Sequence, residues 1–135
     1  MAFAKIPSGG GDFFKPADAE GFTLLVEPKH FFPQQNHPFN PGEFRDEATA
    51  DVTLFDSNFK AVNVLEEAKF TNGVLANTIG DLLKQGGQGQ MFVATVGKPN
   101  GKRYWKFFGV SDSVEEKVAK YVETRNAEFD ALLED

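Results

Sequence analysis

Residues 46–55 alternate between apolar and polar side chains with a period of two. The apolar set is Ala48, Ala50, Val52 and Leu54, and the polar set is Glu47, Thr49, Asp51 and Thr53. Successive side chains of a β-strand point to opposite faces, so this stretch predicts a strand with one face in a core and the other toward solvent. The chain therefore contains a sheet, and its other segments must be arranged around that sheet.

Turn-forming residues on both sides of this stretch divide the neighbouring sequence into two more strands. Residues 22–27 predict a strand that ends at Pro28, because proline has no N–H to donate to a ladder. Residues 61–70 predict another strand, which an Asn-Gly pair ends. The segment between the first two strands, residues 29–44, is rich in Pro and Phe and is expected to be a long loop.

The second half of the chain predicts two helices and two strands. Apolar residues recur at helical spacing over residues 74–85, and a Gly-Gly pair follows them. Residues 91–96 and 103–110 predict two strands joined by a Pro-Asn-Gly turn. Ser113 and Glu116 have the spacing of a capping box at the start of a C-terminal helix. The predicted order is three strands, a helix, two strands and an appended helix.

Composition and charge divide the chain into three parts. Residues 1–20 have Gly- and Pro-rich linker chemistry and are expected to form a flexible N-terminal segment. Residues 21–111 hold the predicted sheet, and 135 residues in all suit one domain. Residues 112–135 hold 8 acidic and 3 basic residues and are expected to form an acidic helix or tail. The net charge of -6 is thus concentrated at one end, and the near-neutral remainder can still present a basic face.

Cations and large aromatic side chains are interleaved in one short run: Lys102, Arg103, Tyr104, Trp105, Lys106, Phe107 and Phe108. In an extended strand, Arg103, Trp105 and Phe107 share one face and the intervening residues share the other. Flat π faces beside positive charge suit single-stranded nucleic acid, because bases stack on the rings while the cations contact phosphates. The alternative interpretation is that the aromatic residues belong to the core and the cations extend from its rim.

The basic residues near this run have no acidic neighbours in the sequence. No Asp or Glu lies between Asp81 and Asp112, although the chain is acidic overall. The four cations predicted to contact phosphate on the hairpin are Lys98, Lys102, Arg103 and Lys106. A cluster of this kind is the electrostatic footprint of a nucleic-acid-binding surface, whatever the net charge of the chain.

The order of elements is that of the OB-fold, a five-stranded Greek-key barrel, here with a helix between strands three and four and an appended C-terminal helix. In this order and in its basic aromatic run, the chain resembles the small OB-fold single-stranded DNA-binding proteins of bacteriophages. The resemblance implies an α+β protein that coats single-stranded DNA without catalysis during replication, recombination or repair. It departs from the cellular relatives at its end, which reads Phe-Asp-Ala-Leu-Leu-Glu-Asp instead of an acidic run with a Pro-Phe tip.

Aromatic residues of the Pro-rich segment at 29–44 are further candidates for base stacking. Phe31, Phe32 and Phe39 can each offer a ring worth roughly 1–3 kcal/mol per stacked base, or Phe31 and Phe32 can close the end of a barrel. The two histidines, His30 and His37, lack a third ligand at a familiar spacing, so no metal site is predicted.

Several classes of function are not favoured by the sequence. The chain has no cysteine, which excludes disulfides, thiolate nucleophiles and Cys-based metal sites. No nucleophilic constellation or phosphate loop is recognisable, so neither an enzyme nor a cofactor is predicted. Without an apolar run long enough to span a bilayer, the protein is expected in the cytoplasm, of the host cell if it is viral.

The partners compatible with these features are single-stranded DNA, replication proteins that dock on the acidic tail, and further copies of the chain; a membrane is not among them. The alternative function is a structural or protein-interaction β-barrel module of a viral assembly.

Overall fold

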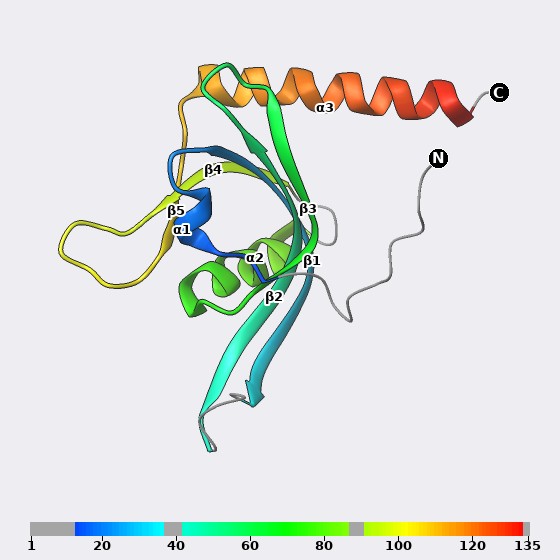
Figure 1. The fold of residues 1–135 in the computed structure, drawn as a ribbon. Helices are drawn as coiled ribbons and strands as arrows, with labels where there is room; N and C mark the ends of the chain where they lie inside the picture. Colours follow the sequence, from blue (N-terminus) through cyan, green and yellow to red (C-terminus); the bar gives the residue numbers. More distant parts are fainter. Residues whose placement is uncertain (1–12, 37–41, 87–90, 134–135) are drawn as a thin grey trace.

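The computed structural model describes residues 13–36, 42–86 and 91–133 (Figure 1). Its helices and strands, in chain order, are α1 (Pro16–Ala19), β1 (Thr23–Asn36), β2 (Phe44–Phe55), β3 (Ala61–Phe70), α2 (Gly73–Gly86), β4 (Phe92–Gly97), β5 (Lys106–Phe108) and α3 (Asp112–Leu133). The predicted α+β class, the helix between the third and fourth strands and the appended C-terminal helix are confirmed.

The five strands form one antiparallel sheet in the order β3-β2-β1-β4-β5. The first three strands follow one another along the chain, and β4 returns through α2 to lie beside β1. This spatial order, with the fourth strand beside the first, is a Greek key. The sheet is curved but open, because no ladder joins β3 to β5 within the described residues (Figure 1), so the predicted closed five-stranded barrel is not confirmed.

The first strand is much longer than predicted, and the prediction of a loop over residues 29–44 was wrong for residues 29–36, which belong to β1; residues 37–41 lie outside the described part. β1 pairs with β2 from Thr23 opposite Phe55 to Asn36 opposite Phe44. β4 pairs with β1 at residues 24–26 and β3 pairs with β2 no further than Ala48, so the outer end of the ladder, residues 32–36 with 44–47, extends beyond the rest of the sheet as a β-ribbon. We call residues 27–36 of β1 with residues 44–51 of β2 the arm.

Proline is tolerated in the arm for two reasons. β4 pairs with β1 only at residues 24–26, so one side of β1 is an edge beyond that point. Register shifts also fall between Pro28 and His30 and between Phe32 and Gln35, an interval that contains Pro33. Edges and bulges are the positions where a missing N–H interrupts no ladder hydrogen bond.

The main core lies on the face of the sheet that α2 covers. Ala48, Ala50, Val52 and Leu54 are buried there, as their alternation predicts. α2 can approach β1 closely because residue 80 is glycine: a Cβ atom at this position would lie 2.7 Å from the ring of Phe31. The opposite face of β2 is less solvated than predicted, since Glu47, Thr49 and Thr53 are buried as well.

The N-terminal segment reaches the same core across the gap between β3 and β5. Phe14 is buried and stacks on Phe70, with ring centroids 4.4 Å apart. Its backbone N–H donates to the carbonyl oxygen of Lys69 at 2.8 Å. Residues 13–20, which belong to the segment predicted to be flexible, therefore pack on the sheet, while residues 1–12 lie outside the described part.

The C-terminal helix α3 packs on the other face of the sheet through a smaller cluster. Val118 is buried with Leu25 and Phe55, and the ring of Tyr121 meets Phe55 edge-on at 5.0 Å. The helix starts at Asp112, and the side chain that accepts a hydrogen bond at its first turn is Ser111, not the predicted Ser113.

An ion pair fixes the middle of α3 to the sheet. Arg125 donates to both carboxylate oxygens of Glu27, at 3.0 and 3.1 Å. These hydrogen bonds raise the pKa of Arg125 above its usual value, so the guanidinium stays charged. Beyond Arg125 the helix projects past the sheet, and Phe129 and Leu132 are exposed (Figure 1).

Candidate nucleic-acid interface

The predicted basic hairpin is a loop followed by a very short strand. β4 ends at Gly97 and β5 comprises only Lys106–Phe108, so residues 98–105 connect the two strands without pairing. The loop begins with a turn in which the N–H of Lys102 donates to the carbonyl oxygen of Pro99 at 2.9 Å, and Gly101 supplies a φ of 76°. We call residues 98–108 the basic loop; it projects from the sheet in Figure 1.

Burial of one aromatic residue sets the orientation of β5. Phe107 is only 8% exposed and packs against Phe70 and Phe92 in the core. Because side chains alternate along a strand, its neighbours Lys106 and Phe108 point outward. Both are exposed in the structure.

Lysines of the basic loop lie over its aromatic rings. The Nζ atom of Lys98 is 4.9 Å from the ring centroid of Trp105, and that of Lys106 is 5.8 Å from the ring of Phe108. Trp105 is half-buried and packs against the main core with its remaining surface. Such contacts order the lysines only weakly, at about 0.5–1 kcal/mol each when exposed.

The loop gathers five of the predicted site residues on one exposed segment: Lys98, Lys102, Arg103, Trp105 and Lys106. Phe107, also predicted, lies in the core, where a base cannot reach its ring. Two aromatic residues missing from the prediction are more accessible: Tyr104 is 44% exposed and Phe108 is 37% exposed. The alternation of side chains along residues 102–108 predicts that Tyr104 and Phe108 point outward once Phe107 is known to be buried.

The cations of the loop differ from those elsewhere in their partners. The ion pairs in the described residues are Lys29 with Asp51, Arg45 and Lys69 with Glu47, and Arg125 with Glu27. None of them involves the basic loop. Four exposed positive charges therefore stand in this part of the structure without a carboxylate partner.

The aromatic residues of the arm have separate positions and roles. Phe31 packs on α2 at Gly80, and the Nζ atom of Lys84 lies 5.8 Å from its ring. Phe32 is exposed on the arm, with its ring 6.0 Å from that of His30. Phe39 and His37 lie outside the described residues.

The structure does not bring the exposed arm aromatic together with the basic loop. In the ladder between β1 and β4, Val26 lies opposite Phe92 and Leu24 opposite Ala94. β4 therefore runs away from the arm and delivers the basic loop at the other end of β1. The arm and the loop project from different sides of the curved sheet (Figure 1).

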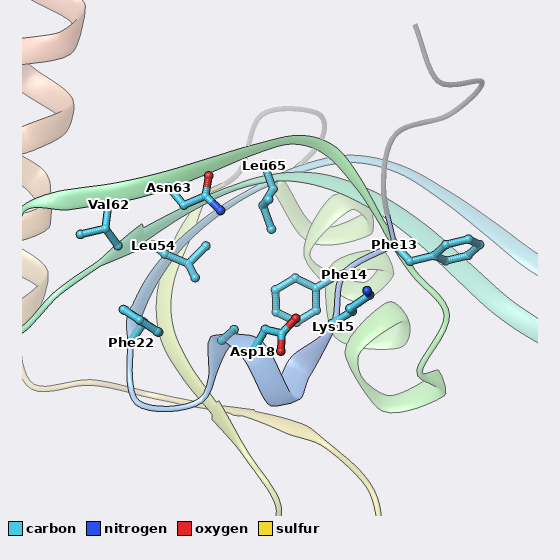
Figure 2. A pocket seen from close by; sticks show the side chains of 10 residues that line it. Phe13, Phe14, Lys15, Asp18, Phe22, Leu54, Val62, Asn63 and Leu65 are labelled. Atoms are coloured by element: carbon cyan, nitrogen blue, oxygen red, sulfur yellow. The ribbon is translucent and has the colours of Figure 1, made fainter.

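A separate hollow of about 530 Å³ lies between the N-terminal segment and strands β2 and β3 (Figure 2). Its walls are mostly apolar, with three polar side chains, and include none of the predicted site residues. The lining residues are Phe13, Phe14, Lys15, Asp18, Ala19, Phe22, Leu54, Val62, Asn63 and Leu65.

Comparisons of the chain with protein-family models, with curated proteins and with solved structures find no match. In the described part of the chain, no helix combines the length and apolar character needed to cross a membrane. The same residues include no group of three or more His, Cys, Asp or Glu side chains positioned to hold a metal ion.

Proposed function

We propose that the protein binds single-stranded DNA without catalysis, through the basic loop, in bacteriophage replication, recombination or repair. The observation that carries this proposal is the loop itself, where four exposed cations, none of them in an ion pair of the described residues, share one segment with the exposed rings of Tyr104 and Phe108. A single strand offers phosphates and unstacked bases together, and this surface is complementary to both.

The topology supports an OB-fold assignment. The OB-fold is a partly open, five-stranded Greek-key barrel that binds oligonucleotides beside the loops joining strands one and two and strands four and five. The sheet has the required Greek-key order with a helix between β3 and β4, and the basic loop is the connection of strands four and five. We therefore propose that the open sheet belongs to this class.

Binding proceeds in two steps under this proposal. The cations attract the phosphates, and condensed counterions leave the strand. Bases then stack on Tyr104 and Phe108 at roughly 1–3 kcal/mol per base. Trp105 contributes to the surface when Lys98 exchanges its contact with the ring for a phosphate, because the lysine covers one face of the indole in the free protein.

A second candidate function is a protein-interaction module of a viral assembly. The exposed Phe129 and Leu132 at the projecting end of α3 favour it, since large apolar side chains at a free helix end are suited to a protein partner. This candidate requires no affinity for nucleic acid, which makes the two functions separable by one titration.

The test is a titration of the protein with oligothymidine at low salt, followed by tryptophan emission, because Trp105 is the sole Trp of the chain. Binding is expected to quench the emission. The Tyr104→Ala, Phe108→Ala double variant should bind more weakly, whereas Lys120→Ala, an exposed cation on α3, serves as the control. Unchanged emission together with no affinity for a labelled oligothymidine would refute the proposal and favour the protein-interaction module.

A further inference from the structure

β3 is the terminal strand of the sheet and has an unoccupied edge. It pairs with β2 on one side, and on the other its only strand contact in the described residues is the bridge of Phe13 to Lys69. In the described part of the chain residues 61–66 therefore have no paired strand on that side, although the N-terminal segment faces Val62, Asn63 and Leu65 across the hollow. Val62 and Val64 are 52% and 51% exposed on this stretch.

This edge is only partly protected: β3 has register irregularities at Val62 and at Glu66 and Glu67, but residues 61–65 lack two common blocks, proline and charge. In an antiparallel strand, part of the backbone N–H and C=O groups point away from the paired neighbour and can bind another strand. Proteins block such edges with Pro, with charges in the middle of the strand, or with a covering helix. Residues 61–65 are Ala-Val-Asn-Val-Leu, without Pro or charge.

One end of the free stretch is defined. At Lys69 the carbonyl oxygen already accepts the N–H of Phe14 on the edge side, whereas the N–H of Glu67 donates to Asp51 of β2, on the paired side, at 2.8 Å. About six residues remain available, a length of roughly 20 Å at the usual rise of a strand.

We propose that this edge pairs antiparallel with the same edge of a second copy of the chain. The charges that flank it are self-complementary: Lys60 precedes the free stretch, and Glu66 and Glu67 end it. All three side chains are exposed, and none belongs to the ion pairs found in the described residues. Antiparallel pairing sets Lys60 of each copy beside the acidic end of the other, whereas parallel pairing would set like charges together.

The resulting dimer has two-fold symmetry, and the contact closes on itself instead of extending into a fibre. An interface of one short strand per copy is smaller than that of a stable complex, so the dimer is weak and concentration-dependent. β5 lies at the other end of the strand order, so both basic loops remain free. The inference needs no DNA binding, but a dimer that presents two loops would gain affinity for a long strand by avidity.

The absence of cysteine makes a direct test possible. Asn63→Cys places a single thiol at the centre of the free edge, opposite its own copy when Lys60 faces Glu66, and oxidation of the purified protein is expected to yield a covalent dimer. Asn77→Cys, at another exposed asparagine on α2, is the matched control and should stay largely monomeric. Sedimentation of the natural protein over a range of concentrations should show a monomer–dimer equilibrium.

Charge exchange tests the direction of pairing. Lys60→Glu should weaken the dimer about tenfold because it creates two like-charge contacts, and Glu66→Lys with Glu67→Lys should do the same. Combining all three changes should restore association, and this rescue also shows that the single changes did not simply unfold the chain. A protein that is monomeric at every concentration, with Asn63→Cys linking no faster than Asn77→Cys, would overturn the proposal and leave the edge to a strand of another protein.

Discussion

The arm and the basic loop each combine aromatic residues with cations, yet the cations have opposite environments. In the arm, Lys29 lies 3.4 Å from Asp51, and Glu47 lies 3.3 Å from Arg45 and 3.5 Å from Lys69. β2 supplies both carboxylates, since it lies between β1, which carries Lys29, and β3, which carries Lys69; Arg45 pairs with Glu47 along β2 itself. The arm is therefore already neutralised by the fold.

In the basic loop no partner strand supplies an acid. Lys98 and Lys106 lie over aromatic rings, and the ion pairs of the described residues include none of its cations. A phosphate can bind there without displacing a carboxylate, whereas in the arm it would compete with one. The two segments have similar residue types, so the ion pairs that the sheet forms with the cations decide which segment is available to a polyanion.

The largest effect is expected from removing cations of the loop. Each phosphate contact to a single strand contributes about 0.7 to the slope of log affinity against log salt. At 50 mM salt this slope corresponds to roughly 0.9 log units of affinity per contact. Lys102→Ala with Arg103→Ala removes two contacts and should therefore weaken oligothymidine binding by roughly 10- to 60-fold. Lys29→Ala in the arm should leave the affinity unchanged. Fluorescence anisotropy measures both. An equal loss in the two variants would place the arm in the binding surface and break the comparison.

The aromatic residues of the arm can be compared in the same way. Phe31 packs on Gly80 and the core, so Phe31→Ala should lower the free energy of unfolding by about 2 kcal/mol, less than a fully buried Phe. Phe32 is exposed, so Phe32→Ala should cost about 0.5 kcal/mol or less. Denaturant unfolding checks both values. If the two variants are equally stable, Phe31 does not hold α2 against the arm.

Salt dependence sharpens the assignment of the loop. With four cations at phosphates, log affinity should fall against log salt with a slope of about -2 to -3. Lys102→Ala with Arg103→Ala should make the slope shallower by about 1.4, and Lys29→Ala should not change it. A slope near zero in the natural protein would remove the electrostatic step from the mechanism.

The sequence patterns correctly predicted the helices and the strand whose buried face follows from their own residue spacing. The alternation of residues 46–55 identified the buried face of β2, and the helical spacing identified α2 and α3. The arm was missed because Pro28 and Pro33 indicate a loop unless it is known that β1 is an edge at that point. Whether a strand has a neighbour on each side depends on the whole sheet, and no window of sequence contains it.

The site was predicted in part for a related reason. The four cations of the loop were recognised from their charge and spacing, but Phe107 was taken for a stacking residue although it fills the core beside Phe70 and Phe92. The buried Phe14 reaches the same core from a segment with linker composition, and Glu47 of β2 forms an ion pair with Lys69 of β3. These contacts join residues whose proximity only the tertiary structure determines.

The acidic end of α3 tests whether the charges of the basic loop are as free as their contacts indicate. Truncation after Asn126 removes Glu128, Asp130, Glu134 and Asp135 but keeps Val118 and the Arg125 to Glu27 ion pair. The shortened protein should therefore stay folded, with an unfolding free energy close to that of the full chain. Circular dichroism and denaturant unfolding measure this.

Truncation after Asn126 should also have the smallest effect on binding. α3 is one continuous helix that starts four residues after β5, so its last turns lie roughly 25–30 Å along the axis from the basic loop. Repulsion between these acids and a bound strand acts over that distance at 10 mM salt, where the Debye length is about 30 Å, but not at 150 mM, where it is about 8 Å. Removing them should strengthen oligothymidine binding about two- to fivefold at 10 mM salt and leave it unchanged at 150 mM. A gain in oligothymidine affinity that persists at 150 mM salt would mean that the acidic tail contacts the basic loop directly. The cations of the loop would then have acidic partners, as those of the arm do.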